Sequence, residues 1–546
     1  MKKFEFNFPY SINPKYRKRT AYFSMEYGIH QPFKIYSGGL GFLAGSHMRS
    51  AHDLQQNLVG IGIKWKYGYY DQIRKMDQTM DVLFQEKVYG FLVDTNIKFT
   101  IQVNSTEVHV TAFYLPPDVF GTVPMFFLST DLPENDYLAQ TISHKLYDAH
   151  LEAKIAAGIL LGVGGAKLLE ILDHVPEIYH LNEAHGLPLA YYLYHKFNYK
   201  IEEVKKRLVF TNHTPEEAGN QKTNIFLLER MHYFHQVPLD KVREIGGSMD
   251  KDSEILDHTL AALNMAKISN GVSSMHGDVM RKMWNPDSKV GPIIHITNAQ
   301  NHRYWADHDL NEACRRNDME ALKKRKKELK KQLFEEVADQ AGEIYDENIL
   351  TIVWARRFAE YKRADLITQD QERFHQLITN KKYPVQIIWA GKPYPMDYGA
   401  ISIFNRIVHL SKKYSNCSIL VGYEMRLSKL LKQGADIWLN TPRITREASG
   451  TSGMTASMNA AVNFSIPDGW IPEYSKNGIN SFTLSPSDHL LTPFEQDSID
   501  SKKVMDMLED EIIPMYYNEP QKWMNVVKNS MKDILPFFDA DRMAHE

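Results

Sequence analysis

The second half of the sequence alternates regularly between short apolar segments and amphipathic ones, and this pattern constrains the fold most. Five apolar segments have the length of buried strands: Ile349–Ala355, Val385–Ala390, Ser418–Val421, Asp436–Leu439 and Ala461–Ser465. After the first four, segments with helical periodicity begin near residues 364, 399, 424 and 451. Alternation of strands and helices predicts an α/β fold with a parallel, doubly wound sheet.

The first half mixes β-rich segments with long helical ones. Strand patterns occur at Ala21–Met25, Val59–Trp65, Phe99–Val103, Val108–Tyr114, Met125–Ser129, Ile178–Leu181, Leu208–Asn212 and Ile293–Thr297. Helices are predicted over residues 42–56, 137–172, 186–197 and 256–283. Residues 319–338 combine a Lys run with leucines at helical spacing, which predicts a solvated amphipathic helix rather than a nucleic-acid patch. Residues 500–546 predict helices only.

The charge and cysteine content exclude several classes of protein. The net charge is −3, so neither nucleic acid nor a membrane is expected as the main partner, and a neutral sugar polymer fits better. The longest apolar run, Ile155–Ala166, is too short to span a bilayer and predicts a buried helix. The N-terminus has no apolar core of signal-peptide length, and the two cysteines, Cys314 and Cys417, lie far apart. These features predict a cytoplasmic protein without a disulfide framework, compatible with a homodimer.

Reactive residues of the second half collect where the predicted strands end, and ligands of open parallel sheets bind outside those carboxyl ends. Arg357 and Lys362 follow the first strand, and Tyr423 follows the third. The fourth strand leads to Glu447–Met454, a small, Gly-rich, hydroxylated segment that opens a helix. This segment includes Thr451, Ser452 and Gly453. Free backbone N–H groups and the helix dipole there favour an anion, and Arg357 and Lys362 add positive charge.

The first half carries a Gly-rich turn and two histidines at strand ends. The turn Ser37–Gly41 lies between a strand and a helix, and it is either a backbone necessity or an anion cradle. It contains Gly38, Gly39, Leu40 and Gly41. His185 and His213 each follow a strand, where a histidine is either structural or functional. Neither has metal-ligand spacing with another His or Cys, so we predict no metal site.

Six segments of the sequence form a recognisable set: Ala21–Gly45, Tyr179–His185 (YHLNEAH), Phe210–Pro215 (FTNHTP), Asn270–His276 (NGVSSMH), Ala355–Arg363 (ARRFAEYKR) and Thr441–Asp468. In sequence and in order they resemble the signatures of the α-glucan (glycogen and maltodextrin) phosphorylase family, in its shorter prokaryotic branch. The resemblance implies the GT-B fold, two Rossmann-like domains facing a central cleft, with residues 1–305 and 306–500 as the two domains. C-terminal helices at 501–546 are expected to pack back across the junction. The family resemblance also implies retaining transfer of α-glucosyl units between an α-1,4-glucan and phosphate.

The resemblance assigns roles to single positions. Arg357 and Lys362 match the ligands of the substrate phosphate. Glu447 matches the ligand of sugar hydroxyls, and His213 the residue whose backbone carbonyl faces the anomeric carbon. The other matched positions are the phosphate loop, Gly39 and Leu40; a sugar ligand, Asn298; and residues around the cofactor phosphate, Tyr423, Thr451 and Ser452.

One position departs sharply from the family. The lysine that forms the Schiff base with pyridoxal phosphate (PLP) in the family is replaced by Thr455, which has no amine. The favoured interpretation is a PLP-independent glucosyltransferase that takes a nucleotide sugar as donor. A second is a phosphorylase, using a sugar phosphate, with PLP held noncovalently or by another lysine such as Lys64 or Lys392. A third is an inactive glucan-binding or regulatory homologue.

Overall fold

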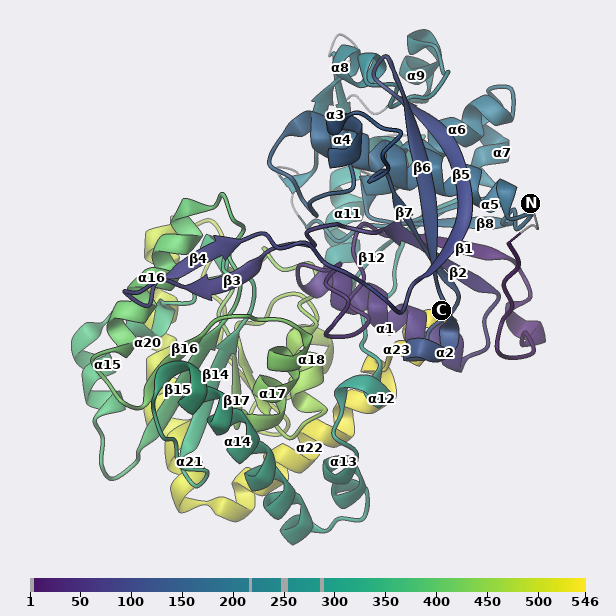
Figure 1. Cartoon of the computed structure of the whole chain (residues 1–546). Helices are drawn as coiled ribbons and strands as arrows, with labels where there is room; N and C mark the ends of the chain where they lie inside the picture. The colour runs from purple at the N-terminus through teal and green to yellow at the C-terminus, as the bar shows by residue number, and fades with distance from the viewer. Residues whose placement is uncertain (1–3, 216–218, 247–253, 285–288) are drawn as a thin grey trace. The chain divides into compact units, whose positions relative to one another are not determined.

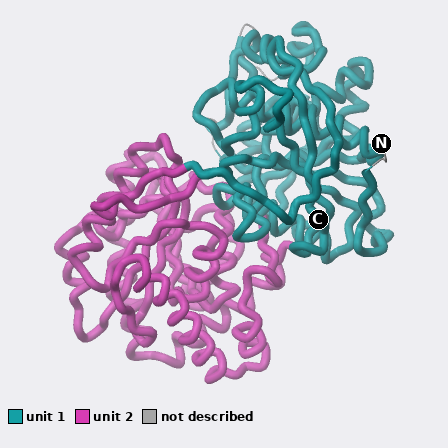
Figure 2. The backbone as a smooth tube through the Cα atoms, viewed as in Figure 1, with its two compact units in different colours: residues 1–69, 84–297, 543–546 teal, residues 70–83, 298–542 magenta. Residues whose placement is uncertain are grey.

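The computed structural model describes residues 4–215, 219–246, 254–284 and 289–546, which form two compact units (Figure 2). One unit contains the chain up to residue 69, residues 84–297 and residues 543–546; the other contains residues 70–83 and 298–542. The chain therefore passes from one unit to the other four times. The domain boundaries predicted at residues 305 and 500 stay predictions, and the inserted segment 70–83 was not anticipated.

The second unit is built on a six-stranded parallel sheet (Figure 1). Its strands are β14 (Leu350–Ala355), β15 (Val385–Ala390), β16 (Cys417–Leu420), β17 (Ile437–Asn440), β18 (Val462–Ser465) and β19 (Phe482–Thr483). The order across the sheet is β16-β15-β14-β17-β18-β19, the order of a doubly wound Rossmann sheet. Strands β14 to β17 are buried along their whole length, as the apolar segments predicted.

Helices connect and cover these strands. They are α12 (His302–Trp305), α13 (His308–Arg315), α14 (Met319–Ala341), α15 (Gln371–Ile378), α16 (Tyr398–Ser411), α17 (Met425–Gly434), α18 (Ser452–Ser457), α19 (Ile471–Tyr474), α20 (Pro493–Met507), α21 (Ile513–Asn518) and α22 (Pro520–Phe538). The helix α23 (Ala540–His545) begins in the second unit and ends in the first. In the first unit, the His545 ring lies 2.8 Å from the Tyr16 hydroxyl.

The prediction of a solvated Lys-rich helix is wrong for two residues of α14. Lys326 is buried, and its ammonium donates to the carbonyls of Gln433 and Asn459 at 2.8 Å each. Lys330 is buried against Asp436 at 2.6 Å. The aliphatic stem of a lysine packs like an apolar side chain, so helical spacing of leucines alone does not show which lysines face the sheet.

The first unit contains a nine-stranded sheet. Its order is β13-β12-β9-β8-β1-β2-β7-β6-β5, in which β5 and β6 are antiparallel and the other seven strands are parallel. The strands are β1 (Thr20–Phe23), β2 (Leu58–Ile63), β5 (Val93–Val103), β6 (Thr106–Leu115), β7 (Met125–Ser129), β8 (Ile178–Asn182), β9 (Leu208–Thr211), β12 (Ile268–Gly271) and β13 (Ile293–His295). The parallel part is also doubly wound, with its switch point between β1 and β8.

The helices of the first unit are α1 (Gly39–Asp53), α2 (Pro117–Phe120), α3 (Tyr137–Thr141), α4 (Leu151–Ile159), α5 (Gly165–Ile171), α6 (Pro188–Lys196), α7 (Ile201–Lys205), α8 (Ile225–Arg230), α9 (Leu239–Ile245), α10 (His258–Met265) and α11 (Ser274–Trp284). The predicted helices at 42–56 and 186–197 correspond to α1 and α6, whereas the two longer predicted helices are interrupted by other elements. The predicted helix 137–172 is several elements, and the predicted helix 256–283 contains the strand β12. The strand β12 has only four residues, Ile-Ser-Asn-Gly, which are too few to show a period of two, and this explains the second error.

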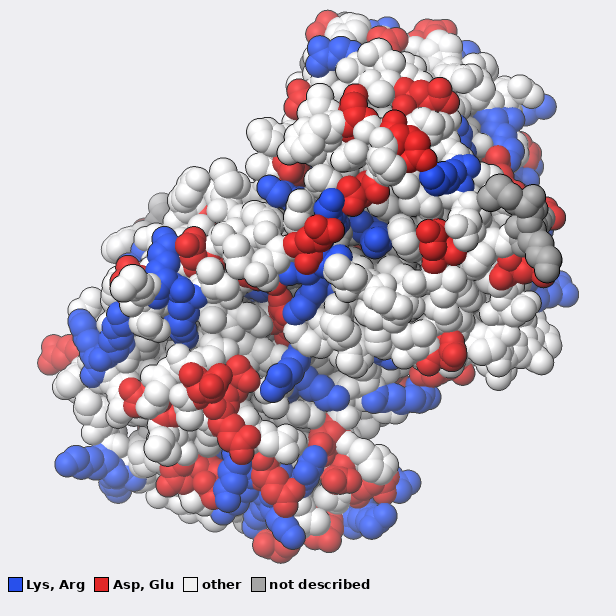
Figure 3. Space-filling view, viewed as in Figure 1, with Lys and Arg blue, Asp and Glu red and all other residues white. Residues whose placement is uncertain are grey.

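The buried Gly-rich run joins α4 to α5 through a π-helical turn, Leu160–Gly164. A Cβ on Gly162 would lie 2.6 Å from the backbone nitrogen of Leu189, so glycine lets this helix approach α6 closely. No helix within the described part of the chain is long and apolar enough to cross a membrane. On the face shown in Figure 3, acidic and basic side chains are interspersed, in keeping with the small net charge.

A two-stranded hairpin, β3 (Asp71–Arg74) and β4 (Met80–Leu83), belongs to the second unit although the first half of the sequence supplies it. Another short pair, β10 (Lys222–Asn224) and β11 (Ile255–Asp257), lies in the first unit. The predicted α/β class with parallel sheets is confirmed. Its finer assignment to the GT-B architecture stays a prediction.

Candidate active site

The switch point of the second unit's sheet lies between β14 and β17. Crossover connections run in opposite directions from these two neighbours, which opens a crevice outside their carboxyl ends. Arg356 and Lys362 follow β14, and Glu447 follows β17. Because the ends of these two strands are neighbours in the sheet, Glu447 contacts Arg356 and Lys362, which lie 91 and 85 positions earlier in the chain.

Arg356, Lys362 and Glu447 form a buried charge cluster. Arg356 Nη2 donates to Glu447 Oε2 at 3.2 Å, and Lys362 Nζ donates to Glu447 Oε1. The three residues are 6%, 9% and 8% exposed. Two cations against one carboxylate leave one surplus positive charge, which is costly inside a protein without an anion. The cluster therefore favours binding of an external anion.

Two polar atoms at this site are buried and have no hydrogen-bond partner within the described residues: Arg356 Nη1 and Ser449 Oγ. Buried donors in folded proteins are nearly always satisfied, so such atoms are candidates for ligand contacts. Gly450, at φ +90°, borders the same space: an added Cβ would lie 3.1 Å from Glu447 Oε2 and 3.2 Å from Arg356 Nη2. The absence of a side chain at residue 450 thus leaves space next to the charged groups of Glu447 and Arg356.

The charges of the cluster shift one another's pKa values. Burial alone would raise the pKa of Glu447, but Arg356 and Lys362 outweigh it and lower that pKa to about 2. Burial, and then the charge of Arg356, lower the pKa of Lys362 to about 7 although Glu447 opposes this. At neutral pH the carboxylate is therefore ionised, and Lys362 titrates.

Asp468 holds the backbone of Glu447 in place. Its Oδ2 accepts the backbone N–H groups of Arg446 and Glu447, both at 2.9 Å, and its Oδ1 accepts that of Gly469 at 2.9 Å. Burial raises the pKa of Asp468 to about 6 in spite of these hydrogen bonds. The loops after β17 and β18 are joined through this one carboxylate.

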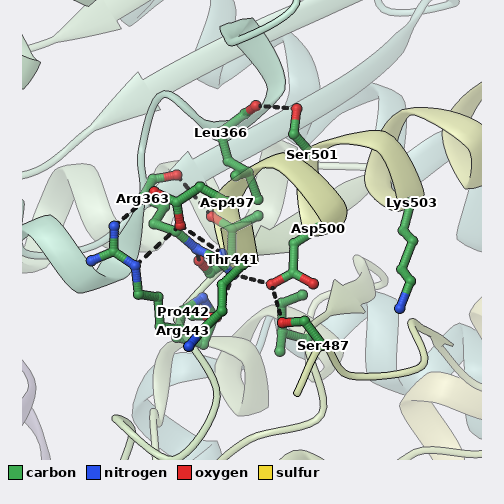
Figure 4. A network of polar contacts seen from close by, with 12 residues as sticks. Arg363, Leu366, Thr441, Pro442, Arg443, Ser487, Asp497, Asp500, Ser501 and Lys503 are labelled. Atoms are coloured by element: carbon green, nitrogen blue, oxygen red, sulfur yellow. Dashed lines mark hydrogen bonds and ion pairs between the residues drawn. The ribbon is translucent and has the colours of Figure 1, made fainter. Parts of the chain in front are cut away.

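A second network, drawn in Figure 4, anchors the loops that carry the cluster. Arg363 donates to the carbonyls of Thr441 and Pro442, both at 2.8 Å, which joins the loop after β14 to the loop after β17. Its guanidinium also pairs with Asp497 and Asp500 of α20, at 3.0 and 2.9 Å. Arginine suits this role because its fork of N–H groups can satisfy several acceptors in one plane.

The residues predicted from sequence in this unit have different surroundings. Arg357 is exposed, whereas its neighbour Arg356 is buried in the cluster. Tyr423 is buried, and its hydroxyl donates to the carbonyl of Ala355 at 3.3 Å. Asn298 is buried in the segment between β13 and α12. A phosphate-binding role for Arg357 stays a prediction, and the structure brings Arg356 beside Lys362 and Glu447.

The other predicted positions of this unit lie in the helix α18 or directly before it. Thr451 directly precedes it. Ser452 Oγ accepts the indole N–H of Trp438 at 3.3 Å. A Cβ on Gly453 would lie 2.3 Å from Asn463 Oδ1, so packing of the helix on β18 explains this glycine. The helix has only six residues, so the predicted anion site at its N-terminus stays a prediction.

Position 455 does not fit a covalently bound PLP. Thr455 is fully buried, and its hydroxyl donates to the carbonyl of Ser452 at 3.0 Å. A hydroxyl cannot form an imine with the aldehyde of PLP. Of the two lysines considered as substitutes, Lys392 is ion-paired with Glu424 at 2.9 Å. The other, Lys64, lies over the ring of Phe113 at 3.9 Å.

In the first unit, a buried carboxylate holds the Gly-rich turn after β1. Glu26 is 2% exposed, and its Oε2 accepts the backbone N–H groups of Ser37 and Gly38 at 2.6 and 3.3 Å. Its Oε1 accepts the Tyr147 hydroxyl at 2.8 Å. A Cβ on Gly38 or Gly39 would meet no atom within 4 Å. The fold itself thus uses two N–H groups of the predicted cradle and leaves open space over Gly38 and Gly39.

The two predicted histidines follow β8 and β9 of the first unit, whose sheet has its own switch point between β1 and β8. The His213 ring lies 2.7 Å from Asn182 Oδ1, and the His213 backbone N–H donates to Glu183 Oε1 at 2.6 Å. Glu183 has φ +70°, an unusual backbone angle for a non-glycine residue, and burial raises its pKa to about 7. The His185 Nδ1 atom is buried without a hydrogen-bond partner within the described residues. Burial lowers the pKa of both histidines, so both rings are neutral at pH 7.

Sequence reasoning missed several residues of these sites: Arg356, Asp468, Glu26, Glu183 and Tyr147. Most lie inside the segments that resemble the phosphorylase signatures, just after a strand, so a search for charged residues at strand ends finds them. Tyr147 has no such signal. In the described ranges, no group of three or more His, Cys, Asp or Glu side chains could hold a metal ion.

Comparison with known proteins identifies the family to which this chain belongs. Residues 295–477 match the phosphorylase family model, described as carbohydrate phosphorylase. A maltodextrin phosphorylase of Thermococcus litoralis is 32% identical over 98% of this chain and 70% of that protein. A glycogen phosphorylase of Aquifex aeolicus is 30% identical over 97% of this chain and 85% of that protein. The chain belongs to the carbohydrate phosphorylase family. An uncharacterized protein of Methanocaldococcus jannaschii is 44% identical over 97% of this chain and 98% of that protein.

Lys362 should make anion binding depend on pH. Its lowered pKa of about 7 means that the ammonium is charged below that pH and neutral above it. Sulfate keeps its charge across this pH range, so a change in its affinity reflects titration of a group of the protein. We expect sulfate to bind most tightly below pH 7 and to lose up to about tenfold in affinity for each pH unit above it. Calorimetry at a series of pH values measures this. In a Lys362→Arg variant the dependence should disappear; an equal dependence in that variant would contradict the assignment.

Proposed function

We propose that this chain is a retaining α-glucosyltransferase of the phosphorylase type that acts on an α-glucan or a related oligosaccharide. The observation that carries this proposal is the surplus positive charge of Arg356, Lys362 and Glu447 at the switch point of the sheet. Transfer of a glucosyl unit passes through an oxocarbenium-like state, and the leaving group gains negative charge as it departs. Buried, preorganised cations stabilise that charge.

The same cluster suggests how the sugar is held. In the structure, both cations pair with Glu447. A bound phosphate competes for Arg356 and Lys362 and thereby releases lone pairs of the carboxylate, which can then accept hydrogen bonds from sugar hydroxyls. Anion binding and sugar binding are coupled in this proposal. The roles of His213, Asn298 and the Gly-rich turn, and the GT-B architecture, are further parts of it.

We further propose a nucleotide sugar as the donor and no covalent PLP. In the family resemblance, a PLP phosphate acts beside the substrate phosphate, and Thr455 cannot hold PLP as an imine. A nucleoside diphosphate leaves as a stabilised anion, so it needs less help from a second phosphate. The phosphate next to the sugar would bind Arg356 and Lys362, and the other would bind near Thr451. A phosphorylase with noncovalent PLP remains the competing candidate, and the next experiment separates the two.

A pair of assays should identify the donor. We expect release of a nucleoside diphosphate from a UDP-, ADP- or GDP-sugar in the presence of maltodextrin, because the cluster stabilises that leaving group. A phosphorolysis assay on glycogen without added PLP is run beside it and should give no glucose 1-phosphate. Borohydride treatment followed by peptide mass mapping should find no pyridoxyl-lysine.

Three results would contradict this proposal in different ways. Phosphate-dependent release of glucose 1-phosphate, with no activity on any nucleotide sugar, would assign a phosphorylase. A pyridoxyl-lysine would show a relocated cofactor. No activity in either assay, together with tight maltodextrin binding, would indicate a non-catalytic glucan-binding protein.

A further inference from the structure

The β3–β4 hairpin places one buried side chain between two glycine turns that follow β15 and β16, next to the strand β14 that leads to Arg356. Gln72 is 5% exposed. Its Nε2 donates to the carbonyl of Gly391 at 3.0 Å, and its Oε1 accepts the backbone N–H of Gly422 at 3.0 Å. Gly391 directly follows β15, and Gly422 follows β16. A single amide from the first half of the sequence thus bridges residues 319 and 350 positions away.

Both of these turns depend on glycine. Gly391 has φ +154° and Gly422 has φ +74°, angles that other residues rarely adopt. A Cβ on Gly391 would lie 1.8 Å from the carbonyl oxygen of Arg356, so the turn packs directly on the backbone of the cluster arginine. Glycine turns have many accessible conformations, so an external contact is needed to hold them in one. Gln72 supplies that contact to both turns at once.

Residues next to the two bridged turns form hydrogen bonds with the segment that contains Arg356. The backbone N–H of Arg356 donates to the carbonyl of Ala390 at 3.2 Å, on the residue before the first turn. On the side of the second turn, the Tyr423 hydroxyl donates to the carbonyl of Ala355 at 3.3 Å. Arg356 is therefore flanked by two contacts whose geometry depends on the turns that Gln72 holds.

The hairpin makes further contacts with the same loops. The Tyr70 hydroxyl donates to the carbonyl of Pro393 at 2.7 Å. Lys392 donates to the carbonyl of Tyr70 at 2.8 Å and pairs with Glu424 at 2.9 Å. Elsewhere the hairpin docks on α16, where the backbone N–H of Met80 donates to Asn405 Oδ1 at 3.2 Å. This last contact holds the hairpin without touching the loops, so it offers a matched control.

We propose that Gln72 is a positioning residue that sets the placement of Arg356 for anion binding by holding the glycine turns after β15 and β16. The inference rests on the proposed anion site, and it adds that the first half of the sequence completes this site through the hairpin.

The test compares two single variants by calorimetry with sulfate and with ADP. Gln72→Met keeps the volume of the side chain but removes both hydrogen bonds, whereas Asn405→Ala removes a bond between the same hairpin and α16. We expect both to lose similar, modest amounts of thermal stability. Gln72→Met should bind either anion about tenfold more weakly than the wild type, and Asn405→Ala within about twofold of it. A purely structural role would change stability without this difference in affinity.

Hydrogen exchange gives a second measurement that needs no ligand. In Gln72→Met, the amide of Gly422 should exchange at least about tenfold faster, because its acceptor is lost, while Asn405→Ala leaves it protected. If Gln72→Met binds sulfate and ADP as the wild type does, the inference is overturned and the anion site stands. If the wild type binds neither, the proposed anion site fails, and the inference fails with it.

Discussion

Replacing Arg356 with Ala is expected to lower kcat/KM about 10²–10³-fold on the best donor, which corresponds to about 3–4 kcal/mol of transition-state stabilisation. The guanidinium is buried, it pairs with Glu447 at 3.2 Å, and its Nη1 atom has no partner within the described residues. Charges in such an environment are poorly screened by water and salt. Sulfate affinity should fall in parallel, which calorimetry measures without an activity assay.

The neighbouring arginine supplies the control. Arg357 is exposed, so its charge is screened, and we expect Arg357→Ala to lower kcat/KM by less than about tenfold. An Arg356→Lys variant should recover part of the loss, because one cation remains but the fork of donors does not. The opposite order, with Arg357→Ala far more damaging than Arg356→Ala, would support the role that the family resemblance implies for Arg357 and refute anion binding by Arg356.

Replacing Glu447 with Gln should destabilise the protein by about 3–5 kcal/mol, because it leaves two buried cations without their carboxylate. The lowered pKa of Glu447, about 2, shows that the ionised form is the one stabilised in the native protein. Glutamine has nearly the same shape, so loss of packing does not contribute. Thermal unfolding or urea denaturation at neutral pH measures the effect.

Sulfate should restore part of this lost stability. An anion that binds Arg356 and Lys362 stabilises the native state by mass action, and in the Glu447→Gln variant it no longer competes with a carboxylate. We therefore expect sulfate to raise the melting temperature more in the variant than in the wild type, with chloride at equal ionic strength as the control. Glu360→Gln removes an exposed partner of Arg443 and should change little. Equal stabilisation by sulfate and chloride would argue against an anion site.

The sequence alone predicted five of the six strands in the sheet of the second unit; β19, with two residues, was not predicted. The segment Val385–Ala390 is the strand β15 residue for residue, and the other predicted strands of that half lie within two residues of the observed ones. A continuous apolar run predicts a strand that is buried on both faces. In a parallel sheet the carboxyl ends of all such strands lie at one edge, so the residues that follow each run are predicted to lie at that edge. The sequence therefore predicts that Lys362, Glu447 and Tyr423 lie at the carboxyl edge of the sheet, and in the structure they follow β14, β17 and β16.

The tertiary structure decided which side chains enter the site. Because β14 is buried on both faces, its sequence has no alternation of apolar and polar residues that would show which of Arg356 and Arg357 points inward. The roles of Gln72 and Tyr147 have no local signal either, since each acts on a residue far away in sequence: Gln72 on Gly391 and Tyr147 on Glu26. Periodicity and local propensity describe neighbours along the chain, whereas these contacts exist only after the sheets have wound and the hairpin has docked.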